Sequence, residues 1–543
     1  MDEFSIENLA ENILTRWLKT RVETVYGISI EPEVFPPDNS EFGDSTTNLP
    51  FNLAGVVKKS PVEIGREIIA ENIPEIFSDA QVVGGYINFW LSDEYIHHMI
   101  RNIITHPECW GKIINHNPKK IQVEFVSANP TGPLNIVSAR AATVGSTLAN
   151  VLSAIGNNVQ TEFYVNDAGN QIKLLTESFN IRIAQIKGEN VQLPENAYHG
   201  EYLIEYAREY MENDEPIPAM DWILERILAE QKETLHRFRT DFDVWFSERE
   251  FRKSGKIEQV LNRLEQKSLI YHNEGAKWFS ASKIDPDVED FVLVKSDGEW
   301  AYGLVDIAYH INKFEERQFD IVYTILGPDH HGHKARLETA MNALGHKNKL
   351  KIIILQQVNL IENGERVMMS KRAGKLITMD VLVDDVGVDA ARYFFLARKA
   401  EAHLDFDINL ARDTSEENPV YYIQYAYARI NGILDFAKQK GMDVDKIRNA
   451  NLNILTEPEE RKLIRKIVRF PSEIMNTAYL MQPHIIPFYL FDIAKIFHNF
   501  YTKHRVVCDD ERLALARCAL ISAVAKTIER GLNICGIEAP EQM

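Results

Sequence analysis

The chain has 543 residues, enough for three or four domains, and its 45% hydrophobic and 26% charged content is typical of a globular protein. A net charge of −19 argues against indiscriminate nucleic-acid binding, although local basic and aromatic surfaces of an acidic protein can still read a folded RNA. The four cysteines lack metal-ligand spacing, so we expect reduced thiols. The start is unlike a targeting peptide, and no apolar run approaches the roughly 18 residues that cross a bilayer. We therefore expect a cytoplasmic protein with no membrane partner.

The first 110 residues or so are predicted to form a separate α+β domain. Residues 6–26 have the apolar spacing of an amphipathic helix, and FGDSTTNLPFNLAGVVKK (42–59) combines a turn with a second helix. Ser60 and Pro61 open a third helix, and VVGGYINFWLS (82–92) is predicted to be a strand. Nothing in this domain has a catalytic pattern.

The stretch from Ile121 to Gly156 organises the rest of the chain. Residues 121–127 form a β-rich apolar run, NPTGP (129–133) has turn chemistry, and apolar residues then recur at helical spacing until Gly156. In an open α/β sheet, such a strand, loop and helix aim free backbone N–H groups at the crevice where ligands bind. An ordinary turn that binds nothing is the alternative, since most such units have no ligand.

A second strand is predicted over residues 159–165, followed by a helix that opens with NDAGNQIKLL. Asp167, Asn170 and Gln171 are expected to face the same crevice, although Asp167 could equally cap the helix. From about 180 to 270 the chain is charged and helical, which indicates a helical insertion between the two halves of a sheet.

Two polar clusters follow in the second half of the chain. Tyr302 and Asp306 are four residues apart and share one face if their segment is helical. Residues 321–345 repeat the strand, loop and helix plan, with Asp329 beside His330, His331 and His333. Histidines at a helix start can bind a metal or a nucleotide; we predict no metal, because no remote Cys/His pair completes a site.

The strand KIIILQQVNLI (351–361) leads to GERVMMSKRAGKLITM (364–379), where Ser370 and Lys371 would form a loop that carries positive charge. Residues 411–543 have the pattern of a helix bundle with short polar loops.

Taken in order, these segments resemble class I arginyl-tRNA synthetases. The similarity includes FGD and Gly-Tyr-Ile-Asn near the start, SANPTGPL with its Ala-Arg helix start, the Asn-Asp-x-Gly-x-Gln and Gly-x-Asp-His-His-Gly runs, and ENPVYYIQYAYARINGIL in the bundle. The resemblance implies a multidomain α/β protein with a Rossmann-like catalytic domain. Its parts would be an N-terminal tRNA-elbow domain (1–110), the catalytic domain (118–375) with a helical insertion at about 180–270, a junction (376–410) and an all-α anticodon-binding bundle (411–543).

The implied reaction is ATP-dependent attachment of L-arginine to tRNA(Arg) through an arginyl-adenylate. ATP with Mg²⁺ would be a substrate, no tightly bound cofactor is implied, and the protein would be a monomer. The alternative is a paralogue with impaired adenylation that binds arginine or tRNA in a regulatory role.

The family's two phosphate motifs are altered in this chain. Where the family has His-x-Gly-His, the loop reads Asn135-Ile136-Val137-Ser138, and where it has Lys-Met-Ser-Lys, the chain reads Met368-Met369-Ser370-Lys371. The resemblance assigns catalysis to Asn135, Ser138 and Lys371. It assigns ATP binding to Pro133, Leu134, Asn135, Val137, Ser138, Val367, Met369, Ser370 and Lys371.

A guanidinium group is a planar fork of donors that needs carboxylates around it. Glu124 ends the first strand and Asp306 lies one helical turn after Tyr302, so these carboxylates suit an arginine pocket; ordinary internal ion pairs are the alternative. The resemblance gives the arginine-binding set as Glu124, Asn129, Tyr302, Asp306, Asp329 and His330. It gives the tRNA contacts as Tyr86, Asn88, Tyr425 and Arg429, for which packing within a core is the alternative.

Overall fold

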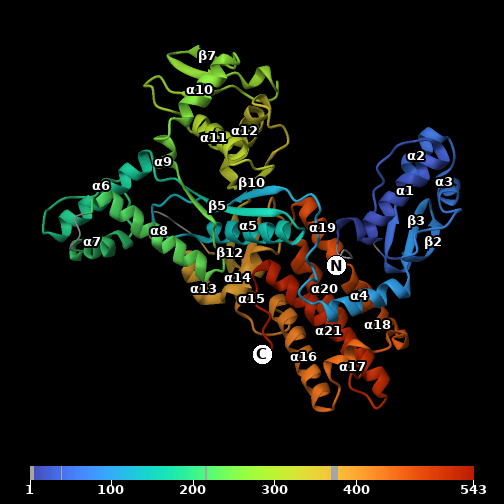
Figure 1. Cartoon of the computed structure of the whole chain (residues 1–543). Helices are drawn as coiled ribbons and strands as arrows, with labels where there is room; N and C mark the ends of the chain where they lie inside the picture. The colour runs from blue at the N-terminus through green and yellow to red at the C-terminus, as the bar shows by residue number, and fades with distance from the viewer. Residues whose placement is uncertain (1–4, 38, 214–216, 368–376) are drawn as a thin grey trace. The chain divides into compact units, whose positions relative to one another are not determined.

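The computed structural model describes residues 5–37, 39–213, 217–367 and 377–543. The chain divides into two compact units, which are described separately. Unit 1 comprises residues 1–117, 154–156 and 414–543, and unit 2 comprises residues 118–153 and 157–413. Figure 1 labels the elements along the chain. Among the described residues, no helix is both long and apolar enough to cross a membrane.

Unit 1 begins with a small α+β domain. Its elements are α1 (Ala10–Tyr26), β1 (Ser45–Thr47), α2 (Leu49–Val57), α3 (Pro61–Ile68), β2 (Phe77–Val83), β3 (Tyr86–Leu91) and α4 (Asp93–Thr105). The three strands form an antiparallel sheet in the order β1-β3-β2. Ser60 caps α3, and Glu63 completes a capping box.

The segment 82–92, predicted to be one strand, is instead part of a hairpin. Gly84 and Gly85 have φ values of +61° and +99° and form the turn between β2 and β3. A Cβ atom on Gly85 would lie 2.7 Å from the ring of Phe51, so the turn requires glycine for space as well as for conformation. The sequence prediction missed the turn because apolar residues flank both glycines.

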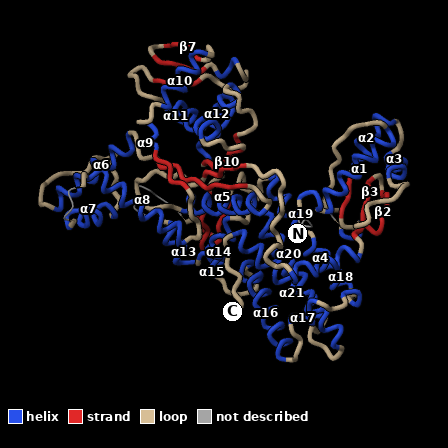
Figure 2. Tube along the Cα trace, in the orientation of Figure 1, coloured by secondary structure: helices blue, strands red, loops and turns tan. Residues whose placement is uncertain are grey.

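The second part of unit 1 is a helix bundle, which Figure 2 shows as almost entirely helical. Its helices are α16 (Pro419–Gln439), α17 (Val444–Arg448), α18 (Pro458–Val468), α19 (Phe470–Leu480), α20 (Ile485–Lys503) and α21 (Glu511–Cys535). The sequence pattern did not separate α19, which begins immediately after α18. Pro471 is tolerated there because the first turn of a helix needs no backbone donor.

Asp44 of the FGD segment joins the two parts of unit 1. Its carboxylate is buried, accepts a hydrogen bond from the backbone N–H of Leu91 at 2.8 Å, and forms an ion pair with Arg465 of α18. Arg469 also donates to the Asp44 carbonyl at 3.3 Å. Trp110 adds a second link by donating from Nε1 to Thr527 Oγ1 of α21 at 3.0 Å. The FGD aspartate is therefore a structural residue.

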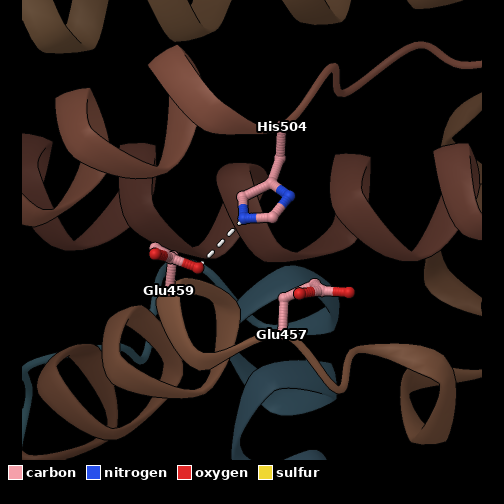
Figure 3. A group of neighbouring side chains, drawn as sticks. All are labelled: Glu457, Glu459 and His504. Carbon is pink, nitrogen blue, oxygen red and sulfur yellow. Dashed lines mark hydrogen bonds and ion pairs between the residues drawn. The ribbon is translucent and has the colours of Figure 1, made fainter.

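The bundle also contains a group of side chains with metal-ligand chemistry, Glu457, Glu459 and His504 (Figure 3). The Glu459 carboxylate accepts from His504 Nε2 at 3.1 Å and from Lys503 Nζ at 2.5 Å. The Lys503 ammonium already neutralises this carboxylate, so the group is an ion-pair cluster that joins α18 to the end of α20.

Hydrogen bonds from Lys503 and His504 lower the pKa of Glu459 from 4.5 to about 2. A carboxyl whose pKa falls on folding contributes stability above its unfolded pKa and loses it as the pH falls toward the folded value. We therefore expect Glu459→Gln to lower the melting temperature at pH 7, by a margin that narrows as the pH drops below about 4.5. Thermal unfolding from pH 7 to pH 3.5, with the exposed Glu75→Gln as control, tests this; a margin independent of pH would contradict it.

Unit 2 is built on a five-stranded parallel sheet. Its strands are β4 (Lys120–Glu124), β5 (Asn158–Val165), β6 (Val244–Ser247), β10 (Ile321–Leu326) and β11 (Leu350–Ile354), in the order β11-β10-β4-β5-β6. The strand order reverses direction between β4 and β10, and ligands of open α/β sheets bind at the carboxyl ends beside such a switch point. The predicted Rossmann-like core is confirmed.

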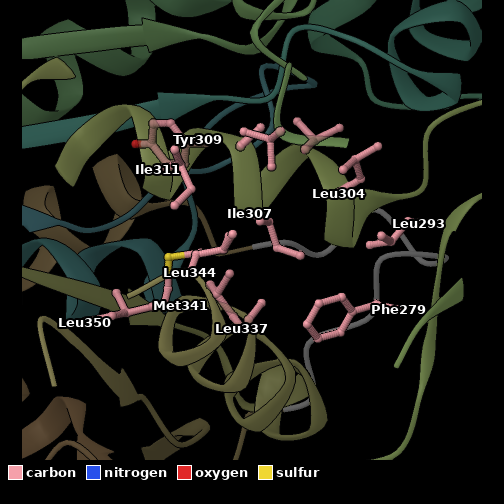
Figure 4. Packing of buried hydrophobic residues seen from close by; sticks show 14 of the residues in the cluster. Phe279, Leu293, Leu304, Ile307, Tyr309, Ile311, Leu337, Met341, Leu344 and Leu350 are labelled. Atoms are coloured by element: carbon pink, nitrogen blue, oxygen red, sulfur yellow. The ribbon is translucent and has the colours of Figure 1, made fainter. Parts of the chain in front are cut away.

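Helices and a second sheet cover this core. They include α5 (Ile136–Ala154), α9 (Glu248–Arg252), α10 (Lys256–Gln266), α11 (Tyr302–Ile311), α12 (His331–Ala343) and the antiparallel strands β7 (Ile270–Asn273), β8 (Ala276–Phe279) and β9 (Phe291–Val294). Figure 4 shows how Ile307 of α11 packs among Leu337, Leu344 and Phe279. On α5, Gly145 admits the ring of Phe125, since a Cβ atom there would lie 2.1 Å from that ring.

The predicted helical insertion is a three-helix arm with its own core. It consists of α6 (Asn170–Ile186), α7 (Tyr202–Glu212) and α8 (Ala219–Arg237), and Phe179 stacks on Trp222 at 5.8 Å in its centre. The helical region predicted up to about residue 270 is interrupted by β6, after which α9 and α10 continue to Gln266. The β-favouring residues of β6 rejoin the parallel sheet, and β7 starts the antiparallel one.

Unit 2 ends with β12 (Val358–Glu362), β13 (Glu365–Arg366), α13 (Met379–Val386), α14 (Val388–Phe395), β14 (Leu404–Asp407) and α15 (Ile408–Arg412). The fully buried Arg140 of α5 ties this region to the core. It donates to the carbonyls of Gln356 at 2.7 Å and of Lys399 and Ala402 at 2.9 Å each. Burial lowers the pKa of Arg140 to about 10, so the guanidinium stays charged at neutral pH.

Candidate functional site

The backbone turns sharply where β4 ends at the switch point. Val126 and Ser127 have φ values of +66° and +44°, a conformation that non-glycine residues rarely adopt. The Ser127 hydroxyl holds this turn by accepting from the backbone N–H of Tyr164 at 3.2 Å and donating to Glu124 Oε1 at 3.3 Å. Strained backbone of this kind is concentrated at functional sites, so the end of β4 is the natural centre of the site.

The loop that follows β4 is supported by the helical arm. Gln231 of α8 donates from Nε2 to the carbonyls of Gly132 at 2.9 Å and Asn129 at 3.3 Å, and Tyr202 of α7 donates to the Thr131 carbonyl at 2.6 Å. A Cβ atom on Gly132 would lie 3.0 Å from the Tyr202 hydroxyl. The arm thus fixes the loop that precedes α5.

Asn135 caps α5, a role that the sequence analysis did not anticipate. Its side-chain oxygen accepts from the backbone N–H groups of Val137 at 2.9 Å and Ser138 at 3.1 Å. Ser138 is buried, with its hydroxyl 3.5 Å from the same oxygen. An Asn directly before an apolar helical pattern is a recognisable N-cap signal. The amide oxygen of Asn135 therefore serves the helix, and only its amide nitrogen is placed to donate elsewhere.

The loop is also joined to the segment after the second phosphate motif. Asn135 forms an antiparallel bridge with Thr378, and Met379 N–H donates to the Leu134 carbonyl at 2.8 Å. Val367 lies before the motif and donates its N–H to the Leu360 carbonyl at 2.9 Å. The predicted residues Met369, Ser370 and Lys371, with Met368, lie outside the described part of the chain.

Beneath the end of β4, two buried glutamates pair with two cations, the buried Lys313 and the partly exposed Arg317. Glu124 Oε2 lies 2.5 Å from Lys313 Nζ, and Glu162 Oε2 lies 2.5 Å from the Arg317 guanidinium. Lys313 Nζ is also 3.7 Å from Glu162 Oε1. Burial raises the pKa of the Glu124 carboxyl above its ordinary value, and Lys313 opposes that rise. Lys313, Glu162 and Arg317 were not among the predicted site residues.

Lys313 could have been found from the sequence, because it lies seven residues after Asp306 and so falls near the same helical face. A lysine within the apolar run IAYHINKF also conflicts with that run unless a buried carboxylate pairs with it.

Tyr302 and Asp306 lie on α11, as their spacing suggested, and Asp306 is buried. His333 Nε2 of α12 lies 2.6 Å from Asp306 Oδ2, and the rings of Tyr302 and His333 are 5.0 Å apart. Tyr302 is 48% exposed, and the negative charge of Asp306 holds the pKa of its hydroxyl well above its usual range. Burial and the nearby His333 lower the pKa of His330, so its imidazole is neutral at neutral pH. The sequence missed the Asp306–His333 pair.

The remaining predicted arginine-site residues are placed differently. Asn129 donates from Nδ2 to Gln171 Oε1 at 2.5 Å, at the start of α6. Asp329 is exposed in the turn before α12. Asp167, expected either in the crevice or as a cap, accepts from Ser247 Oγ at 2.6 Å and Arg249 N–H at 2.7 Å, and so ties β5 to the start of α9.

The four predicted RNA contacts divide by exposure. Tyr86 is 43% exposed beside Phe51, whereas Asn88 is 3% exposed and accepts from Thr46 Oγ1 at 2.7 Å. The buried amide of Asn88 supports the sheet, so Tyr86 is the residue of this pair that is exposed for a contact. Tyr425 and Arg429 are half-buried on α16, where the guanidinium lies 4.4 Å from the Tyr425 ring centre.

Comparison with known proteins agrees with this architecture. Residues 99–401 match the catalytic domain of class I (R) tRNA synthetases, residues 9–91 match the arginyl-tRNA synthetase N-terminal domain, and residues 423–543 match the DALR anticodon-binding domain. The fold resembles the Thermus thermophilus arginyl-tRNA synthetase, with a TM-score of 0.80 at 20% identity over 98% of this chain and 100% of that one. The parallel sheet is thus that of a class I aminoacyl-tRNA synthetase catalytic domain.

Close sequence relatives narrow the family. The arginine-tRNA ligase of Carboxydothermus hydrogenoformans is 41% identical over 525 residues, covering 94% of both chains. That of Desulforamulus reducens is 41% identical over 530 residues, again covering 94% of both. This chain belongs to the arginyl-tRNA synthetase family, which confirms the resemblance seen in its motifs.

Proposed function

We propose that this chain is an arginine-tRNA ligase that joins L-arginine to tRNA(Arg), with ATP and Mg²⁺ as a substrate pair. In the first step an oxygen of the arginine carboxylate attacks the α-phosphorus of ATP, and pyrophosphate leaves. In the second step a hydroxyl of the terminal ribose of tRNA attacks the arginyl carbonyl, and AMP leaves. The observation that carries this proposal is the pair of buried carboxylates, Glu124 and Asp306, beside the capped helix start at the switch point.

The proposed arginine pocket uses charge from two elements. Glu124 at the end of β4 and Asp306 on α11 receive the guanidinium, and Tyr302 and His330 line the approach. Asn129 and Asp329 bind the α-amino end. A buried charged site discriminates strongly, because a wrong amino acid leaves its carboxylates without a partner.

The proposed ATP site uses the loop before α5 and the segment around residue 370. Pro133, Leu134 and Val137 shape the loop, and Asn135 and Ser138 place the positive end of α5 toward the phosphates. Val367, Met369 and Ser370 bind ATP, and Lys371 neutralises the departing pyrophosphate. Fixed donors of this kind act mainly in the transition state, where phosphoryl charge develops.

The proposed domain roles follow the order of the chain. Residues 1–110 contact the tRNA elbow through Tyr86, residues 118–375 carry the chemistry, residues 376–410 form the junction, and residues 411–543 bind the anticodon through Tyr425 and Arg429. We also propose that the enzyme is a cytoplasmic monomer. The alternative of a paralogue with impaired adenylation has no observation in its favour beyond the altered phosphate motifs.

Transfer of labelled arginine to total tRNA, with ATP and Mg²⁺ and a heat-inactivated control, tests the function. We expect arginine, and no other amino acid, to become acid-precipitable with the tRNA. Retained arginine binding with no charging and no adenylate formation would instead support the non-catalytic alternative.

A further inference from the structure

Lys313 is a fully buried cation with no role in the mechanism described above. Its ammonium lies 2.5 Å from Glu124 Oε2 and 4.1 Å from the centre of the Tyr309 ring. Burying an ammonium costs several kcal/mol unless it is well paired, so the position of Lys313 needs a reason.

The backbone around Lys313 is specialised. Residues 312–316 form a π-helix directly after α11, in which Asn312 Nδ2 donates to Glu316 Oε2 at 2.8 Å. Single π-helical turns are rare and frequently occur at functional sites. Four residues further on, Arg317 pairs with Glu162. Arg317 neutralises Glu162, and Lys313 is the cation that pairs most closely with Glu124.

We propose that Lys313 is a positioning residue of the arginine pocket, which holds one carboxylate oxygen of Glu124 and presents that side chain to the substrate guanidinium as an oriented anion. This inference rests on the proposed function, because it assigns the guanidinium to Glu124. Lys313 itself does not touch the substrate, because its partner is Oε2 of Glu124. Among the described residues, Oε1 accepts a side-chain hydrogen bond from Ser127 alone, at 3.3 Å. Each oxygen of an ionised carboxylate can accept two hydrogen bonds, so Oε1 retains capacity for a guanidinium donor.

Electrostatics around Glu124 support this assignment. Burial raises the pKa of its carboxyl, the charges of Glu162 and Asp306 push in the same direction, and Lys313 is the group that lowers it. The negative charge of Glu124 in turn raises the pKa of the neighbouring hydroxyls of Tyr164, Tyr302 and Tyr309. Without Lys313, the carboxyl would be driven toward its neutral form, which cannot make a charge-assisted pair with a guanidinium.

The test measures the dissociation constant of L-arginine for the full chain by titration calorimetry from pH 6 to pH 9. For Lys313→Met we expect L-arginine binding at least about 30-fold weaker than in wild type at pH 7. Affinity should recover as the pH rises, by up to about tenfold per pH unit over the range in which Glu124 is protonated. Wild type and Lys313→Arg should show no such recovery, because both keep a cation beside Glu124.

Arg392→Met is the matched control, since it removes another fully buried cation of unit 2. The Arg392 guanidinium donates to the Phe238 carbonyl and to the hydroxyls of Thr240 and Ser146. The variant can lower stability but should leave the pH profile flat. Citrulline, a neutral isostere of arginine, supplies a second readout: preference for arginine over citrulline at pH 7 should shrink at least about tenfold in Lys313→Met.

Each outcome separates the hypotheses. If Lys313→Met binds arginine like wild type, or more weakly by a factor that is constant from pH 6 to pH 9, the inference is wrong. If that variant does not fold, Lys313→Gln is measured in the same way, and the combined Glu124→Gln/Lys313→Met variant, which removes both charges, should bind weakly with no recovery at high pH. If wild type itself fails to bind arginine, the proposed function fails, whatever the variants do.

Discussion

Asp306→Asn is expected to raise the arginine KM in charging by at least about 100-fold, because truncating one partner of a buried charge pair costs about 2–5 kcal/mol. Asparagine has the same shape as aspartate but no charge. It can still contact His333, which lies 2.6 Å from Asp306 Oδ2, so the packing of α11 against α12 should survive. The loss therefore reports on the guanidinium and not on the fold.

The KM for ATP separates this effect from general damage. We expect it to change by less than about threefold in Asp306→Asn, because effects at sites without shared partners are largely independent. Asp297→Asn is the control, since Asp297 lies in an exposed turn of the same unit. Within the described residues, its side chain accepts a hydrogen bond only from the Glu299 N–H. An unchanged arginine KM in Asp306→Asn would remove this carboxylate from the pocket.

The sheet was predictable because its strands and helices carry strong local patterns. The helical spacing up to Gly156 predicted α5 closely, whereas the apolar run at residues 121–127 predicted β4 but extended it three residues beyond its end at Glu124. Other elements required contacts that no local pattern contains. The hairpin at Gly84–Gly85 depends on the close approach of Phe51, and α19 depends on a break of one residue after α18.

Part of the candidate site was predictable, because some of its residues have a recognisable place on a strand or helix. Glu124 ends a strand, and Tyr302 and Asp306 share a helical face, so type and spacing indicated them. The hydrogen-bond and ion-pair partners of these residues were not predictable, because they depend on which side chains become buried together. Lys313 approaches Glu124 from a segment 189 residues away, and Asn88 turns inward to Thr46 although its neighbour Tyr86 is exposed.

The structure gives Asn135 a helix-capping role that the sequence analysis did not anticipate. The variant Asn135→Asp is therefore expected to have a large effect on adenylate formation. Asn135→Asp keeps an oxygen that can cap α5 through the N–H groups of Val137 and Ser138. It also places a negative charge where ATP phosphate is proposed to bind. Two unit charges about 4 Å apart interact by about 4 kcal/mol at an effective dielectric of 20, so we expect adenylate formation to fall by roughly 100- to 1,000-fold.

Stability and activity should move in opposite directions in this variant. Aspartate is as good a cap as asparagine and interacts favourably with the positive end of α5, so the melting temperature of Asn135→Asp should be unchanged or higher. Asn135→Ala removes the cap and should cost about 1 kcal/mol of stability. The measurements are thermal unfolding and arginine-dependent exchange of pyrophosphate with ATP in the presence of tRNA.

The comparison of the two variants decides what Asn135 does. If it only caps the helix, Asn135→Asp keeps its activity and Asn135→Ala loses activity in proportion to its loss of stability. If it also faces the phosphates, the stable aspartate variant is the less active of the two. The second pattern is expected, because the cap uses only the oxygen of Asn135 and the helix end that it organises is the proposed phosphate site.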